Sequence, residues 1–289
     1  MRGAGRRFGY GHPGHLAPRG CRISREAALS DPANMEGMAR TKRCVFCDVA
    51  GKRTKEHVIP LWLGPLLHRA QPTTGDSSTG KRFTHRFNPG PDDASPPREW
   101  STDDVDLVTN SVCELCNSGW LHNLETEARP LLTRLILGEE ADLSSAGQKT
   151  VATWSYKTVL LFQLLRSENA RPIPLERFRE LFVLQRPPPE ARVWLGTARG
   201  NNAGRETSTE VNMVNVQHEI PGFFSALALG RLLILCAGRL SPGPEQVQPG
   251  SRGRTRVVVP VWPASLRVVR WPPPEALENL EAKYLVKVV

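Results

Sequence analysis

Two CxxC pairs far apart in the sequence carry the clearest chemical signal in this chain. The first pair is Cys44 and Cys47, and the second is Cys113 and Cys116. A chain that folds back on itself can bring two such pairs together, so that four thiolates surround one tetrahedral zinc ion. The spacing therefore predicts a structural Zn²⁺ site that fastens two distant parts of the backbone to each other.

A carboxylate, an imidazole and an amide accompany the cysteine pairs. Glu56 and His57 lie between the pairs, and Asn117 directly follows the last cysteine. Carboxylate and amide oxygens suit a hard cation such as Mg²⁺ or Mn²⁺, and histidine is the side chain that exchanges a proton near neutral pH with the least tuning. We therefore expect a second, catalytic divalent-ion site next to the zinc.

The run from Cys44 to Glu125 resembles the HNH endonuclease family in its zinc-stapled form. The resemblance lies in Cys44-Val-Phe-Cys47, in Glu56-His57-Val-Ile-Pro60 and in Cys113-Glu-Leu-Cys116-Asn117. In that family such a run forms a ββα-metal core, also called a His-Me finger. The resemblance implies a metal-dependent DNA endonuclease that hydrolyses phosphodiester bonds.

The resemblance also implies a role for each site residue. His57 would be the general base that activates water, Glu56 and Asn117 would hold the catalytic ion, and Asn110 would orient the base. The sequence departs from the family pattern in two places: Asp is more usual than Glu before the histidine, and Trp120 takes the place of a frequent Lys. A zinc-stapled nucleic-acid-binding or interaction protein without catalysis is the alternative.

The residues after Asn117 are expected to form a helix, with Trp120 as a packing residue. At about 100° per residue, an α-helix would place His122 about 140° around the axis from Asn117. Leu121 would occupy the position on the same face as Asn117. On this geometry we expect that His122 is not a further metal ligand.

The composition divides the chain into three parts. Residues 1–40 mix Gly, Pro, Arg and His without periodicity, which predicts a disordered tail. Residues 41–140 form the HNH-like domain, with a flexible insertion at 71–104 that is rich in Gly, Ser and Pro. Residues 141–289 are expected to form an α+β domain with an antiparallel sheet. Its role is open among target recognition, a protein partner and homodimerisation.

Residues beyond Leu143 contain two helix signals followed by strand signals. Ser144 would cap a helix that ends by Arg171, and a short helix would cover Pro174–Leu184. Strands are expected at Ala191–Leu195, Thr209–Gln217, Phe223–Leu229, Arg231–Ala237, Arg256–Val261 and Leu266–Trp271. Val105–Val108 should supply a strand of the HNH-like part, and Glu275–Lys283 a terminal helix.

The formal net charge of +9 is compatible with a DNA partner. Nine basic and three acidic residues precede Cys44, so this stretch contributes six of the nine charges and the remainder is only weakly basic. Translation from Met35 or Met38 would remove most of it. Basic groups at Lys52-Arg53-Thr-Lys55 and Lys81-Arg82 lie closer to the site. They would either form a solvent-exposed charged surface or contact phosphates, and the sequence favours neither interpretation.

Cysteine use and hydropathy bear on the location of the protein. Four of the six cysteines are assigned to metal, which favours a reducing cytoplasm over a disulfide framework. No apolar run approaches the length of a membrane span. We therefore expect a cytoplasmic protein.

Overall fold

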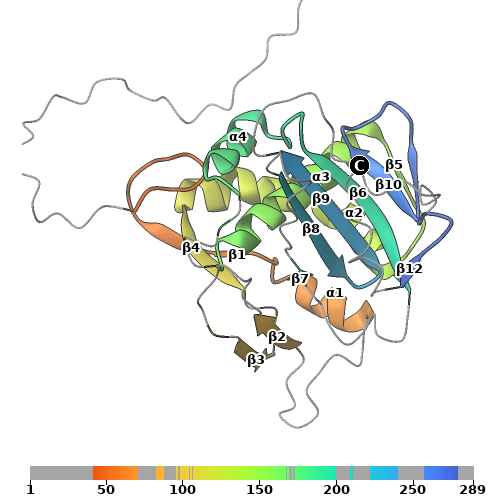
Figure 1. Cartoon of the computed structure of the whole chain (residues 1–289), viewed down its shortest axis with the longest axis horizontal. Helices are drawn as coiled ribbons and strands as arrows, with labels where there is room; N and C mark the ends of the chain where they lie inside the picture. Colours follow the sequence, from red (N-terminus) through yellow and green to blue (C-terminus); the bar gives the residue numbers. More distant parts are fainter. Residues whose placement is uncertain are drawn as a thin grey trace, which may run out of the picture. The chain divides into compact units, whose positions relative to one another are not determined.

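The computed structural model describes residues 42–70, 83–87, 96, 98–103, 105, 107–166, 168, 171, 173–199, 209–210, 222–239 and 257–278. The described residues belong to one compact unit, Thr41–Val289. Helices combine with largely antiparallel sheets, which confirms the α+β class (Figure 1). The expected tail at 1–40 lies outside the described residues. Among the helices of the described ranges, none is long and apolar enough to cross a membrane.

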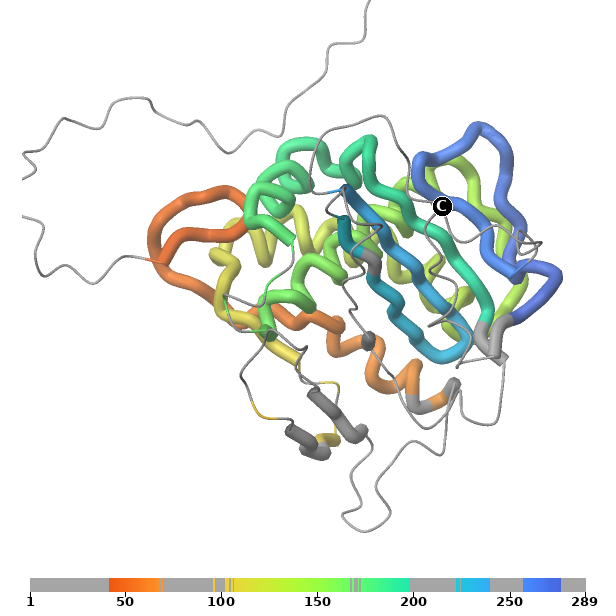
Figure 2. The backbone as a smooth tube through the Cα atoms, viewed as in Figure 1, coloured from red at the N-terminus to blue at the C-terminus, as the bar shows by residue number. Residues whose placement is uncertain are grey.

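A two-stranded antiparallel sheet joins the two cysteine-containing segments. Strand β1 (Arg53–His57) pairs with β4 (Val108–Cys113), and Figure 2 shows these distant stretches of chain side by side. The second strand therefore begins at Val108 and not at Val105 as expected. Helix α1 (Leu63–Ala70) follows β1, with Pro65 in its first turn, where the missing N–H removes no hydrogen bond.

The insertion at 71–104 contains regular structure. Strands β2 (Phe83–Phe87) and β3 (Arg98–Thr102) pair antiparallel, with His85 opposite Trp100. The expectation of a structureless insertion is therefore wrong for these residues. Aromatic and β-branched residues favour the pairing. The strands were not expected because the segments around them are rich in Gly, Ser and Pro, which is typical of loops.

A long helical rod follows the second cysteine pair. The π-helical segment η2 (Cys116–Leu121) continues into α2 (His122–Leu137), and Pro130 lies inside α2 without ending it. Gly138 terminates α2 in the left-handed region at φ 76°, where its N–H donates to Leu135 O.

Helix α3 (Ser145–Gln163) is the central element of the compact unit. The Ser144 side chain accepts a hydrogen bond from the Gly147 N–H, which confirms the expected cap. The helix ends at Gln163, within the expected limit of Arg171. It contacts α2, α4 (Glu176–Leu184) and the strands of the large sheet, so that it is enclosed on several sides (Figure 1).

The large sheet has the strand order β10–β6–β9–β8–β7, with β12 also pairing with β6. Its strands are β6 (Arg192–Arg199), β7 (Thr209–Glu210), β8 (Gly222–Leu229), β9 (Leu232–Arg239), β10 (Val258–Trp262) and β12 (Leu277–Glu278). Gly230 lies in the turn between β8 and β9, at φ 57°. A smaller sheet pairs β5 (Ala141–Leu143) with β11 (Val269–Trp271).

The end of the described chain differs from the expectation. Leu277 and Glu278 pair parallel with Ala198 and Arg199, so the helix expected at Glu275–Lys283 is wrong there. The periodicity of Leu277 and Leu280 resembles a helix face, but pairing with the end of β6, beyond its pairing with β10, decides the local structure. Residues 279–289 lie outside the described residues.

One continuous cluster of buried residues connects the cysteine pairs with the rest of the unit. It contains Phe46 beside the first pair, Leu132 on α2, Trp154 on α3 and Ile234 on β9. The core therefore continues across residue 140. As a result, α3 and α4 can contact the segment that carries the cysteine pairs.

Candidate metal centre and adjoining acidic cavity

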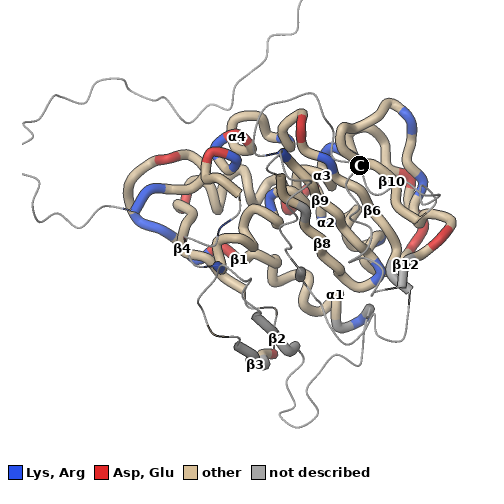
Figure 3. The backbone as a smooth tube through the Cα atoms, in the orientation of Figure 1, with Lys and Arg blue, Asp and Glu red and all other residues tan. Residues whose placement is uncertain are grey.

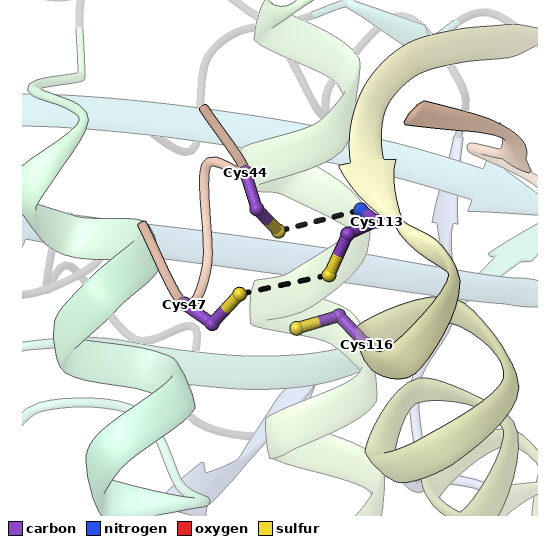
Figure 4. Close-up of side chains that lie close together, drawn as sticks. All are labelled: Cys44, Cys47, Cys113 and Cys116. Atoms are coloured by element: carbon purple, nitrogen blue, oxygen red, sulfur yellow. Dashed lines mark hydrogen bonds between the residues drawn. The ribbon is translucent and has the colours of Figure 1, made fainter. Parts of the chain in front are cut away.

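The four cysteines of the two CxxC pairs converge, as Figure 4 shows. Their sulfur atoms all lie within 4.8 Å of one another, and Cys47 Sγ is 3.6 Å from Cys113 Sγ. A tetrahedral zinc ion with Zn–S bonds of about 2.3 Å separates its sulfurs by about 3.8 Å. The cluster can therefore hold a metal ion such as zinc, as the spacing predicts.

Backbone geometry prepares the first pair for a cation. A tight turn returns the chain after Cys44, with Asp48 in the left-handed region at φ 60° and its N–H donating to Cys44 O at 2.9 Å. The Cys113 N–H points at Cys44 Sγ at 3.4 Å. The pKa of the Cys44 thiol is lowered to about 4, chiefly because the Cys116 thiol donates to it and further because backbone N–H groups do. A stabilised thiolate is the form that binds metal.

Aromatic side chains enclose the cysteine cluster. Phe46, between the first two cysteines, contacts Trp120 edge-on at 5.0 Å and Phe178 of α4 at 5.3 Å between ring centroids. Trp120 also lies 5.9 Å from Phe182. Trp120 is thus a packing residue, as expected. Helix α4 supports the cluster from a position far along the chain.

An acidic cavity of about 180 Å³ begins one residue beyond Cys116. Its lining residues are Glu56, Glu114, Asn117, Ser118, Leu121, His122 and Glu125. The lining includes three glutamates, an asparagine and a histidine, residue types whose oxygen and nitrogen donors suit a divalent cation. Among the described residues, the group of three or more metal-binding side chains whose donor atoms converge is the cysteine cluster. The fold brings together Glu56 and Asn117, the two residues expected to hold the catalytic ion.

Glu56 reaches this cavity from an irregular point of the two-stranded β1–β4 sheet, which is called the ribbon below. The register between β1 and β4 shifts between Thr54 and Glu56, and Glu56 stands opposite Thr109 with only 4% of its surface exposed. Burial raises the pKa of the Glu56 carboxyl to about 7, although the Lys157 ammonium opposes the shift. The Glu125 carboxylate adds to it. A buried carboxylate of this kind is stabilised by a cation.

Asn117 is fastened to the same ribbon. Its Nδ2 donates to Thr54 Oγ1 at 3.0 Å and to the Lys55 carbonyl oxygen at 2.9 Å. The amide nitrogen is therefore engaged at the irregular point of β1. The amide oxygen, a hard donor, is the atom left for a cation.

His57 and Asn110 share the opposite face of the ribbon. His57 ends β1 opposite Val108, and it is half-buried. Asn110 lies two residues beyond Val108 on β4, so both belong to the same face, whereas Glu56 and Thr109 belong to the other. Asn110 is exposed. His57 is not among the residues that line the cavity.

His122 is the lining residue that sequence reasoning had excluded. Its backbone N–H donates to the Asn117 carbonyl oxygen five residues earlier, which is the hydrogen bond of a π-helix. This hydrogen bond reaches back five residues where an α-helical one would reach back four, and His122 lines the same cavity as Asn117. The α-helical geometry from which His122 was excluded therefore does not hold at this turn. The only local hint is Gly119, whose non-helical φ and ψ of −94° and −109° mark a kink.

Lys157 and Glu125 were also missed. Lys157 comes from α3, and its Nζ lies 2.9 Å from Glu125 Oε1 and 4.0 Å from Glu56 Oε1. Lys157 is charged but fully buried, and its neighbours in the sequence are largely apolar. A basic residue in a largely apolar stretch of helix carries no signal of its partner, because that partner lies on another element.

The basic residues at 52–55, at the start of β1, divide into two kinds. The Arg53 guanidinium donates to the backbone carbonyl oxygens of Lys42 and Val49, so it closes the first cysteine turn. Lys52 and Lys55 are exposed, and Figure 3 shows the basic colouring along this stretch. Within the group at 52–55, these two lysines are therefore exposed to a possible phosphate. The second basic group, at Lys81-Arg82, lies outside the described residues.

Fold and site define an α+β protein in which a four-cysteine metal centre adjoins an acidic cavity. Comparisons of the chain with models of known families, with curated proteins and with solved structures find no match.

Proposed function

We propose that this protein is a divalent-metal-dependent DNA endonuclease of the HNH type, with β1, β4 and η2–α2 as its ββα-metal core. The observation that carries the proposal is the cavity that unites Glu56 and Asn117 directly beyond the cysteine cluster. Sulfur ligands would hold Zn²⁺ as a structural ion, and oxygen ligands would hold Mg²⁺ or Mn²⁺. The two kinds of donor atom would therefore make each site selective for its own ion.

Each residue of the chain would then have a defined task. His57 would accept a proton from the water that attacks phosphorus, while the P–O3′ bond breaks and O3′ leaves. Asn110, on the same face, would orient His57. Glu56 and Asn117 would hold the ion, with His122 as a further donor. When bound, the ion would stabilise negative charge on a non-bridging oxygen and on the leaving O3′.

A plasmid-cleavage assay on the full chain tests the proposal. Supercoiled DNA should be nicked or linearised with Mg²⁺ or Mn²⁺ and left intact in EDTA. His57→Ala should lower the rate at least about 100-fold, because the general base is lost, while zinc content stays at the wild-type level. Glu127→Gln, an exposed position on α2, serves as the matched control and should cleave like wild type.

A non-cleaving, zinc-stapled nucleic-acid-binding protein is the second candidate. It is favoured by the absence of His57 from the cavity lining and by the Lys157 ammonium within ion-pair distance of Glu56. Under this alternative, the zinc-loaded chain would retard DNA in a gel without cleaving it under any metal condition. That result would replace the endonuclease proposal.

A further inference from the structure

Three elements meet at one buried ammonium group. Lys157 of α3 has no exposed side-chain surface, and it faces Glu125 of α2 and Glu56 of β1. Its Nζ also lies 5.6 Å from the centroid of the Trp154 ring. A buried ammonium is unfavourable unless it is paired, so these contacts constrain where both carboxylates can lie.

The two carboxylates are not equivalent. Lys157 Nζ donates a hydrogen bond to Glu125 Oε1 at 2.9 Å, whereas Glu56 Oε1 is at 4.0 Å, beyond hydrogen-bond distance. The Glu125 side chain retains 22% exposure and the Glu56 side chain only 6%. The ammonium therefore compensates Glu125 through a direct hydrogen bond and the more deeply buried Glu56 only through a longer ion pair.

We propose that Lys157 is a positioning residue that holds Glu125 in an ion pair and so leaves Glu56 as the carboxylate ligand of the catalytic ion. The inference rests on the proposed function of this cavity. It gives α3, which lies beyond residue 140, a part in the site. The HNH-like segment would then depend on the following segment for its electrostatic balance.

Loss of the ammonium should change two quantities in opposite directions. Without Lys157, Glu125 becomes an uncompensated negative charge in the cavity, which attracts a divalent cation more strongly. The ion would then lie between two carboxylates and not at Glu56, so cleavage would slow. A merely structural role would lower ion affinity and cleavage together.

The first test compares Lys157→Met with Lys157→Arg in the full, zinc-loaded chain. Mn²⁺ binding is followed by calorimetry, and cleavage is measured at saturating Mn²⁺. Lys157→Met should bind Mn²⁺ about tenfold more tightly and cleave at least about tenfold more slowly. Lys157→Arg retains the charge, so both quantities should stay within about threefold of wild type.

Changing the partner supplies the reciprocal test. Glu125→Gln leaves the ammonium free to pair with Glu56, so Mn²⁺ should bind about tenfold more weakly than to wild type. The double variant Lys157→Met/Glu125→Gln removes both charges, and its affinity and rate should return towards wild type. Zinc content and thermal unfolding verify the fold. If Lys157→Met does not fold, the double variant and Glu125→Gln carry the test.

Three results would overturn the inference. Weaker Mn²⁺ binding together with slower cleavage in Lys157→Met would assign Lys157 to the fold alone. A folded double variant that recovers neither quantity would do the same. No Mn²⁺ binding to the wild-type chain would remove the ion site and with it this role. Normal Mn²⁺ binding without DNA cleavage would instead refute only the endonuclease, because the Lys157 variants still report on the ion.

Discussion

The cysteine cluster and the acidic cavity adjoin each other, but they are built in different ways. The cluster uses one local spacing twice, and its four sulfurs already lie within 4.8 Å. The cavity depends on the irregular point of β1, on the π-helical turn and on α3. The cysteine cluster is therefore encoded in short sequence motifs, whereas the acidic cavity depends on tertiary structure.

The two regions also differ in how they carry charge before an ion binds. Hydrogen bonds lower the pKa of the Cys44 thiol, whereas burial raises that of Cys47 and the hydrogen bond to Cys44 raises that of Cys116, so the cluster favours a thiolate at Cys44 alone. Burial raises the pKa of the Glu56 carboxyl to about 7, so the cavity resists a charge there until a cation arrives. The cluster is expected to bind its ion as part of folding, and the cavity to bind its ion afterwards.

Removal of a cluster thiolate should have the largest effect. Cys116→Ser should lose its zinc and about 5 kcal/mol or more of folding stability, since a structural zinc site contributes directly to folding. Elemental analysis and thermal unfolding measure the two losses. Cys236→Ala is the control, because Cys236 is buried on β9 outside the cluster and its variant should retain zinc. Full zinc occupancy with unchanged unfolding in Cys116→Ser would contradict a structural role.

Neutralisation of Glu56 should have the next largest effect, and it should depend on pH. The raised pKa means that the folded chain binds this proton more tightly than the unfolded chain, so wild type loses stability as pH rises from 4.5 to about 7. Glu56→Gln cannot lose a proton there. It should be more stable than wild type above pH 7 by up to about 3 kcal/mol, and the difference should disappear below pH 4.5.

Denaturant unfolding at several pH values, without added divalent ion, measures this difference. The zinc cluster contributes equally to both proteins and cancels. Saturating Mn²⁺ should reverse the order, because the cation stabilises the wild-type carboxylate. Glu127→Gln, on the exposed side of α2, should show no such pH dependence. A constant advantage of Glu56→Gln at all pH values would show that the carboxyl titrates normally.

Motifs with short-range meaning could be predicted from the sequence. The four-cysteine cluster follows from two CxxC spacings, and the start of α3 follows from the Ser144 cap. The shared location of Glu56 and Asn117 follows because each is tied to a cysteine pair by few residues. The Ser144 cap bonds to a residue within one helical turn. The positions of the cysteines, and of the residues close to them, are restricted by the need to place four sulfurs around one metal ion.

Features set by long-range packing could not be predicted in this way. The π-helical hydrogen bond from His122 to Asn117 depends on a single extra residue, which hydrophobic periodicity does not detect. The pairing of Lys157 with Glu125 joins two helices whose relative position is fixed only by the core. β12 likewise depends on a long-range pairing, with the last two residues of β6.

A smaller effect on folding stability is expected from the hydrogen bond that holds Asn117, a lining residue of the cavity, to Thr54 of β1. Thr54→Val keeps the shape of the side chain but removes the oxygen that accepts from Asn117 Nδ2. The second hydrogen bond, to the Lys55 carbonyl oxygen, remains. We therefore expect a loss of about 1 kcal/mol in folding stability with unchanged zinc content. Unaltered stability would show that this contact does not help to hold the two regions together.

His122 should give the smallest change in stability and a selective change in ion binding. Its side chain is exposed, so His122→Ala should alter the free energy of unfolding by less than about 0.5 kcal/mol. Because the π-helical turn places it on the cavity that Asn117 lines, loss of the imidazole should weaken Mn²⁺ binding about fivefold at pH 8. Asn123→Ala, one residue further along α2 and exposed, should leave the affinity unchanged. Equal affinities for wild type and His122→Ala would mean that the π-turn serves the backbone path between cluster and cavity and adds no donor to the ion site.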